Sequence, residues 1–244
     1  MNNFVYGFFY PFKCIKLFFI YPKLIAYSIV PMVINLIIYG TIFYFTFQWI
    51  TGKANDSIDI SNTNFLIEII KTFLKVFTFL LVILVCYFLF IIFGGIVAAP
   101  FNERISRLVE IKFFHHRTSN ELPFLKDAVI SIKEELKKVL FYLSVLIPLF
   151  FINFIPMIGS TISIVVGTPF SFFYNALDYL DYPMTRSMRT FRQKLQVVDS
   201  QRSLSLGFGC MAFLLTVIPV VNVLMNPLLV AAGTSLYHEK KYGK

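Results

Sequence analysis

The chain has 244 residues, of which 57% are hydrophobic, 18% aromatic and only 14% charged. A soluble domain is about 45–50% apolar and about 25% charged, so this composition excludes an ordinary soluble fold and indicates one integral membrane domain over residues 1–244. The apolar runs described below predict that this domain is all-α. The net charge of +9 would suggest a nucleic-acid partner in a soluble protein. Here the basic residues flank apolar runs, where they meet anionic lipid headgroups, and no nucleic-acid recognition motif is present.

Residues 1–23 are basic, rich in aromatic side chains and free of acidic residues. Lys13 and Lys16 are three residues apart and therefore share one face of a helix. The pattern predicts an interfacial amphipathic segment that lies in the headgroup layer and is broken near Gly7 and Pro11. An irregular tail is the alternative.

Two runs without charged residues, 24–52 and 76–102, each exceed the about 20 residues that a spanning helix needs. We expect both to cross the membrane, with a kink at Pro31 in the first and a bend at Pro100 near the end of the second. The segment between them, 53–75, contains a polar loop. It belongs outside the cell, because the segments richest in Lys and Arg belong in the cytoplasm.

Two charged segments, 103–138 and 178–202, are expected to be cytoplasmic, and the first to be helical and to face solvent. The second has arginines at three-residue intervals, which predicts a stripe lying on lipid phosphates. These arginines are Arg186, Arg189 and Arg192.

Arg104 and Arg107 follow the second apolar run at helical spacing. One interpretation places them at the mouth of a pore. The alternative is that they contact headgroups or pair with Glu103 and Glu110.

Two further apolar runs, 139–177 and 203–238, share one design, in which Pro156 and Pro219 each follow an isoleucine near the middle. Each arm is close to or below the about 17 residues that a span requires at minimum. Because proline breaks a helix, the pattern predicts two proline-tipped helical hairpins that insert only partway into the membrane. Two tight spans joined by a very short turn are the alternative.

The tips of these hairpins offer few polar side chains, among them Asn222 and Asn226. A helix that begins just after a break points its N–H groups toward the break, which suits an anion. A simple turn buried in the helical bundle remains the other interpretation.

No nucleotide-binding or catalytic motif occurs in the sequence, so we expect neither an enzyme nor a bound cofactor. The three cysteines lack the spacing of a zinc site or a disulfide framework. His115 and His116 would point apart on a helix, so no metal site is expected. Gly207 and Gly209 open an apolar helix, where glycine favours close packing.

A set of short motifs occurs in a specific order along the chain. They are Ala98-Ala99-Pro100-Phe101-Asn102, Phe154-Ile155-Pro156-Met157-Ile158-Gly159, Asp181-Tyr182-Pro183, Gly207-Phe208-Gly209, Ile218-Pro219-Val220-Val221-Asn222, Met225-Asn226-Pro227 and Ala232-Gly233-Thr234. Together they resemble the CysZ sulfate-permease family, which is part of the larger etoposide-induced membrane-protein superfamily.

This resemblance implies two long spanning helices and two partially inserted helical hairpins, assembled into a homo-oligomer. It also implies a multi-pass protein of the bacterial inner membrane, surrounded by lipids, that takes up sulfate or a related small anion for cysteine biosynthesis. The implied pathway for the anion is an oligomeric pore.

The family's sulfate-binding turn corresponds to the residues just before the first apolar run, and the resemblance assigns anion binding to Lys23, Leu24 and Ile25. Lys23 stands at a glycine position of that turn, and Ile25 and Ala26 stand where arginines are expected. The candidates for pore or mouth residues are Asn35, Asn102, Arg104, Arg107, Asn222 and Asn226.

The missing arginines favour a second hypothesis, because lysine lacks the bidentate fork of arginine and the four apolar runs contain no Lys or Arg to compensate a dianion. In this alternative the chain is a non-transporting membrane scaffold or biogenesis factor of the same superfamily. Both hypotheses stay open on the sequence.

Overall fold

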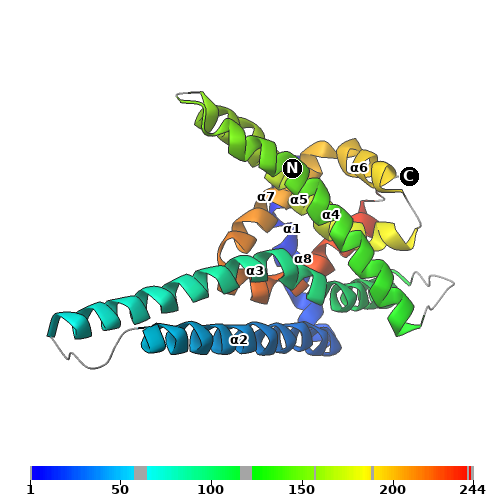
Figure 1. Cartoon of the computed structure of the whole chain (residues 1–244). Coiled ribbons are helices and arrows are strands. Elements are labelled where there is room, and N and C mark those ends of the chain that lie inside the picture. Colours follow the sequence, from blue (N-terminus) through cyan, green and yellow to red (C-terminus); the bar gives the residue numbers. More distant parts are fainter. Residues whose placement is uncertain are drawn as a thin grey trace. The chain divides into compact units, whose positions relative to one another are not determined.

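A computed structural model describes residues 2–57, 65–115, 123–156, 158–187, 190–240 and 242. Over these residues the chain is helical and has no strand, which confirms the expected all-α class. His116, Met157 and Arg189 lie outside the described residues. The helices, labelled in Figure 1, are α1 (Asn3–Ile20), α2 (Lys23–Ser57), α3 (Phe65–Phe113), α4 (Phe124–Ile152), α5 (Gly159–Arg186), α6 (Phe191–Ser200), α7 (Arg202–Val217) and α8 (Pro219–Glu239).

The helices form two compact units, which we describe separately. The first unit comprises residues 1–30 and 99–244, and the second comprises residues 31–98. Helices α2 and α3 each contribute residues to both units.

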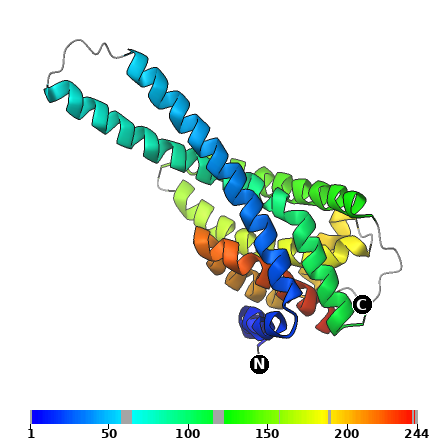
Figure 2. The same cartoon turned by 90° about the horizontal axis from the view of Figure 1, so that it is seen from below.

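In the second unit, α2 and α3 run antiparallel and side by side (Figure 2). The ring of Phe79 lies edge-on against Phe43 and Phe47, at centroid distances of 5.5 and 5.9 Å. The hydroxyl of Tyr39 donates to the carbonyl of Leu89 at 3.2 Å. Many other large apolar side chains of this pair are exposed. Lipid suits such a surface better than water does.

Two helical segments, Lys23–Lys53 and Glu68–Tyr87, are long and apolar enough to cross a membrane. They agree with the two expected spans, but their bounds differ. The first helix continues through the start of the expected loop to Ser57, and the second begins at Phe65. This second helix, α3, continues past Pro100 to Phe113, so the residues expected to end the second span lie inside one long helix.

Helix α1 is continuous, so the predicted break near Gly7 and Pro11 is wrong. Its buried face packs against α7. Pro11 removes one backbone donor from the helix, but the contact with α7 holds the residues before and after Pro11 in place. The opposite face exposes Phe9, Phe12 and Phe19. The residues of the buried face are Gly7, Tyr10, Pro11, Cys14 and Leu17.

The core of the first unit lies where α5, α7 and α8 meet, and it includes the fully buried Leu180, Phe208 and Leu229. At Gly209 the backbones of α7 and α5 touch, because a Cβ there would collide with the carbonyl oxygen of Phe172. This contact confirms the packing role expected for the glycines that open α7.

Two helix pairs follow the charged segment that ends α3. Helix α4 is joined to α5 by a turn that contains Pro156, and α7 is joined to α8 at Ile218, which has an extended backbone. The 16 residues of α7 make a helix of about 24 Å at about 1.5 Å per residue, which is shorter than a hydrocarbon core of about 30 Å. Partial insertion of these pairs into a membrane stays a prediction.

Candidate functional site

The expected anion-binding turn connects α1 to α2. The amide of Leu24 donates to the carbonyl of Tyr21, and the amide of Ile25 donates to the carbonyl of Pro22, both at 3.0 Å. The side chain of Leu24 is buried in the core, whereas Lys23 and Ile25 are exposed. The amides of Leu24 and Ile25 are therefore engaged within the turn, and Lys23 contributes the charged group that an anion would meet.

Two of the expected mouth residues are held by other side chains. Asn102 is buried, and its amide donates to the hydroxyl of Tyr182 at 3.1 Å. Arg107 is also buried and pairs with Asp127 at 2.7 Å and with Glu103 at 3.8 Å. Arg107 thus forms an ion pair with Glu103, one of the two partners that the alternative interpretation of the sequence named.

The remaining candidates lie in different parts of the chain. Arg104, Asn222 and Asn226 are half-buried in the first unit. Asn35 belongs to the second unit, where its amide nitrogen lies 3.4 Å from the carbonyl of Gly94. Its Oδ1 atom is buried without a hydrogen-bond partner among the residues described. A role in anion passage stays a prediction for all of these residues.

A buried cluster around Arg186 was not expected. The Arg186 guanidinium lies 2.5 Å from the carboxylate of Glu103 and 2.6 Å from that of Glu110, and it donates to the hydroxyl of Ser106 at 2.6 Å. His238 from α8 lies 2.6 Å from the other carboxylate oxygen of Glu110. We call these five residues the Arg186 cluster.

The Arg186 cluster corrects two expectations. Arg186 does not lie on a stripe facing lipid phosphates, because its guanidinium is buried between two carboxylates of α3. The charged segment 103–138 does not simply face solvent, because it contributes Glu103 and Glu110 to the interior. The physical reason is that opposite charges from α3 and α5 satisfy each other away from water.

The electrostatics of this cluster differ between its two carboxylates. Burial raises the pKa of Glu103, although Arg186 opposes the shift. Burial also acts to raise the pKa of Glu110, but the hydrogen bond with His238 and the charge of Arg186 outweigh it, so the pKa is lowered. Glu110 is therefore the carboxylate held more firmly in its charged form.

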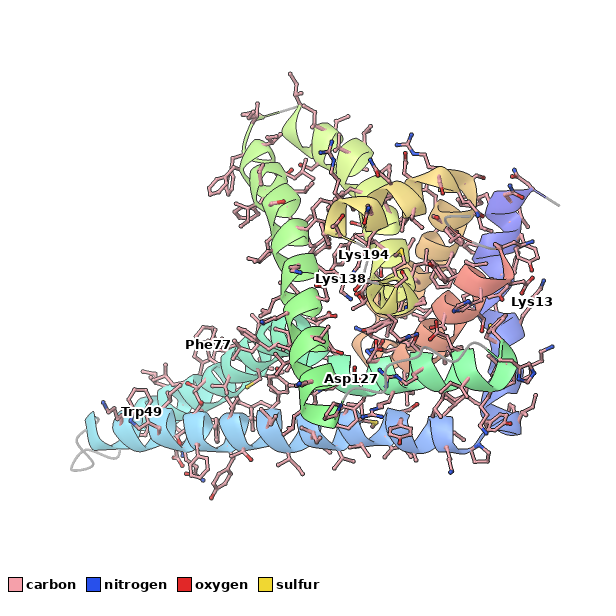
Figure 3. All side chains as sticks on the ribbon, turned by 90° about the vertical axis from the view of Figure 1, so that its right-hand side faces the viewer. Lys13, Trp49, Phe77, Asp127, Lys138 and Lys194 are labelled. Carbon is pink, nitrogen blue, oxygen red and sulfur yellow. The ribbon has the colours of Figure 1, made fainter. Side chains whose placement is uncertain are left out.

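A second buried network joins α4, α5 and α6 around two lysines, Lys138 and Lys194 (Figure 3). Lys138 lies 2.8 Å from Glu135 and also pairs with Asp178. Lys194 lies 2.7 Å from Asp181. We call these residues, together with Glu134, which lies 2.6 Å from Lys194, the two-lysine network.

The two-lysine network holds four carboxylates around two buried ammonium groups. Burial raises the pKa of Glu135 to about 7; Lys138 opposes this shift, and Asp178 and Asp181 add to it. The pKa of Lys138 is well above its ordinary value, because the neighbouring carboxylates outweigh its burial. The network therefore joins the middle of α4 to the C-terminal part of α5, with Lys138 charged.

An open cleft of about 700 Å³ lies along the α4–α5 pair and also touches α7 through Phe213. Its walls are mostly apolar but include hydroxyl groups at Ser160, Ser163 and Thr168. The hydroxyl of Ser163 donates to the carbonyl of Leu149 at 3.0 Å, which ties the two helices together. The cleft is thus a weakly polar surface in a segment expected to enter the membrane.

The sequence contained one signal for the Arg186 cluster. Glu103, Arg107 and Glu110 are spaced four and three residues apart, which places them on one helix face. A charged stripe beside a long apolar run is as compatible with burial against a second charged helix as with exposure to solvent. Its partners on α5 and α8 are far away in sequence, so the spacing alone could not identify them.

Comparison with known proteins identifies the family of the chain. The model of the family described as sulfate transporter CysZ/etoposide-induced protein 2.4 (EI24) matches residues 10–227. A sulfate transporter CysZ of Pectobacterium atrosepticum is 27% identical over 223 residues, which cover 90% of this chain and 80% of that protein. A sulfate transporter CysZ of Salmonella typhimurium is 27% identical over 222 residues, which cover 88% of this chain and 85% of that protein. These relatives are named as transporters rather than enzymes, and because the family model matches most of the sequence, the chain belongs to the CysZ/EI24 family.

Proposed function

We propose that this protein mediates the uptake of sulfate or a related small anion across the bacterial inner membrane, through a pore formed by an oligomer of the chain. The observation that carries the proposal is the family match over residues 10–227. Relatives with similar sequences over most of their length are named sulfate transporters. The two long apolar helical segments supply the membrane anchoring that this function requires.

The turn between α1 and α2 is the proposed anion-binding element. Lys23 carries a positive charge at an exposed position, next to a residue that is anchored in the core. A point charge of this kind attracts an oxyanion but does not impose the bidentate geometry of arginine. We therefore expect Lys23 to provide affinity for small anions, with Leu24 and Ile25 shaping the turn.

The two helix pairs are the proposed lining of the pore. Moving a dianion into a medium of low dielectric constant is too costly without water or polar groups beside it. The cleft of the α4–α5 pair offers hydroxyl groups, and Asn222 and Asn226 offer amides on α8. If these pairs enter the membrane only partway, their tips and polar groups face water inside the oligomer rather than lipid.

Uptake of labelled sulfate into liposomes that contain the full-length protein tests the proposal. We expect uptake above that of empty liposomes, reduced by the Lys23→Ala substitution. Sulfate should also raise the unfolding temperature of the wild-type protein, and this stabilisation should be lost in the same variant. Uptake equal to that of empty liposomes would contradict transport.

A non-transporting scaffold or biogenesis factor is the second candidate function. The pairing of Arg107 with Asp127 and Glu103 favours it, because a cation that is already neutralised attracts an anion less strongly. The same liposome assay separates the two functions. A folded protein that neither binds sulfate nor passes it would support the scaffold.

A further inference from the structure

A second lysine is held beside the proposed anion-binding turn. The ammonium of Lys112, on the last turn of α3, lies 5.5 Å from the ring centroid of Tyr21. The same ring packs edge-on against Phe113, with the centroids 5.4 Å apart. Lys112 and Phe113 therefore both contact Tyr21, the residue that begins the turn.

The turn and the end of α3 both belong to the first unit. The amide of Tyr21 donates to the carbonyl of Leu17 at 2.9 Å, and the carbonyl of Tyr21 accepts from the amide of Leu24 at 3.0 Å. Leu24 is 1% exposed and anchors the start of α2 in the core. These bonds hold the backbone of Tyr21 at the start of the turn, and the edge-on contact with Phe113 holds its ring.

The charges at this place are suited to an oxyanion. Lys23 and Lys112 are both exposed, so their ammonium groups keep donors available for a ligand. Ile25 and Ala26 stand where the family resemblance leads one to expect arginines, so the turn itself supplies one cationic side chain. Lys112 approaches the turn from another helix and adds a second.

We infer that Lys112 is a second anion-binding residue at the Lys23 turn, and that the two lysines together favour dianionic oxyanions over monoanions. The inference rests on the proposed function, because it assumes that the turn binds the transported anion. The physical reason is that the attraction between a lysine and the ligand scales with the charge of the ligand. Two point charges can thus supply part of the selectivity that guanidinium forks would otherwise provide.

Lys112 also has a structural role, and the experiment must separate it from binding. A cation in the last turn of a helix interacts favourably with the helix dipole and, here, with the face of Tyr21. Loss of these contacts lowers stability but leaves anion affinity unchanged. Loss of a ligand-binding charge weakens anion binding, and it weakens binding of a dianion most.

Equilibrium binding of sulfate and of nitrate to the full-length protein in detergent provides this separation, with the unfolding temperature measured in parallel. We expect Lys112→Gln to raise the sulfate Kd about tenfold and the nitrate Kd about threefold, as follows from doubling the ligand charge at an exposed site. Lys112→Arg should keep the sulfate Kd close to that of the wild type. The matched control is Lys126→Gln, which removes an exposed lysine of the same unit and should change neither Kd.

The outcomes separate this inference from the proposed function. If the wild type binds and transports sulfate, and Lys23→Gln weakens binding but Lys112→Gln does not, the role of Lys112 is refuted and the function stands. A Lys112→Gln protein with a lowered unfolding temperature and an unchanged sulfate Kd likewise refutes a binding role for Lys112. Equal weakening for sulfate and nitrate refutes the preference for dianions. If the wild type neither binds nor transports sulfate, the proposed function fails and the inference fails with it.

Discussion

Each buried lysine of the two-lysine network is stable only because carboxylates surround it. The side chain of Lys138 is 1% exposed, and its ammonium lies among Glu135, Asp178 and Asp181. Transfer of such a charge from water is costly, and its attraction to close opposite charges offsets that cost. Removing one member therefore leaves the others buried without a partner. This destabilises the protein more than replacing the whole pair by apolar side chains would.

Replacing Lys138 with methionine should strongly destabilise the protein. The substitution keeps an unbranched side chain of nearly the same length but leaves the carboxylates of Glu135 and Asp178 without their partner, and we expect a loss of about 3–5 kcal/mol. Lys137→Met is the matched control, because the side chain of Lys137 is 55% exposed and its pair with Glu134 contributes little. Unfolding of both variants in detergent, followed by circular dichroism, checks the difference. Similar losses for the two would contradict the account of the network.

Glu135 gives the stability of the protein a specific dependence on pH. Its pKa is raised from 4.5 to about 7, chiefly by burial. Between these values the folded protein holds a proton that the unfolded chain has released, so this contribution to stability is present below pH 4.5 and is lost as the pH rises through about 7. The unfolding temperature of the wild type should therefore fall between about pH 5 and about pH 8.

The Glu135→Gln variant cannot ionise at this position, so its unfolding temperature should fall less over the same range. Glu134→Gln is the control, because the pKa of Glu134 is lowered and its removal does not flatten the curve. A wild type and a Glu135→Gln variant with parallel curves would show that Glu135 does not titrate near neutral pH.

At the scale of the helices, hydrophobicity alone predicted much of the structure. Charge-free runs of sufficient length become the long apolar parts of α2 and α3, because a helix is the way for a single segment to satisfy its backbone in a membrane. Local breaking signals were less reliable. Gly7 and Pro11 did not interrupt α1, because packing on α7 outweighs local propensity.

Helix contacts made through glycine backbones provide a test at this scale. Gly209→Ala places a methyl group against the carbonyl oxygen of Phe172, which is backbone and cannot swing away. We expect a loss of about 1–3 kcal/mol or more from overpacking. Gly40→Ala is the control, because a Cβ at Gly40 meets no atom within 4 Å. The unfolding temperatures of the two variants check this, and a Gly209→Ala protein as stable as the wild type would refute the close contact between α5 and α7.

For the molecule as a whole, the candidate site was less predictable than the fold. The family resemblance pointed to Lys23, but Lys112 is far away in sequence and became relevant only when its position over Tyr21 was known. Long-range contacts also join the ends of the chain. The hydroxyl of Tyr10 in α1 donates to Glu239 at the end of α8 at 2.6 Å, and Tyr6 donates to the same carboxylate. Such pairs carry no periodic signal, so no local pattern could reveal them.

The proposed orientation in the membrane follows from the distribution of basic residues. Segments 1–23, 103–138 and 178–202 are proposed to be cytoplasmic, and the loop between α2 and α3 to be outside. This arrangement places Lys23 and Lys112 on the cytoplasmic side. It also requires both helix pairs, α4–α5 and α7–α8, to return to the side from which they start.

Single cysteines in a background without the three native cysteines test that orientation. Lys53→Cys should react with a membrane-impermeant maleimide added to intact cells, because Lys53 is exposed near the outer end of α2. Lys126→Cys and Arg192→Cys, also at exposed positions, should react only after the membrane is permeabilised. Arg192 tests the first helix pair, because it lies at the start of α6, the next helix after α5. If Arg192→Cys reacts from outside while Lys126→Cys does not, the α4–α5 pair crosses the membrane an odd number of times, and partial insertion would have to be abandoned.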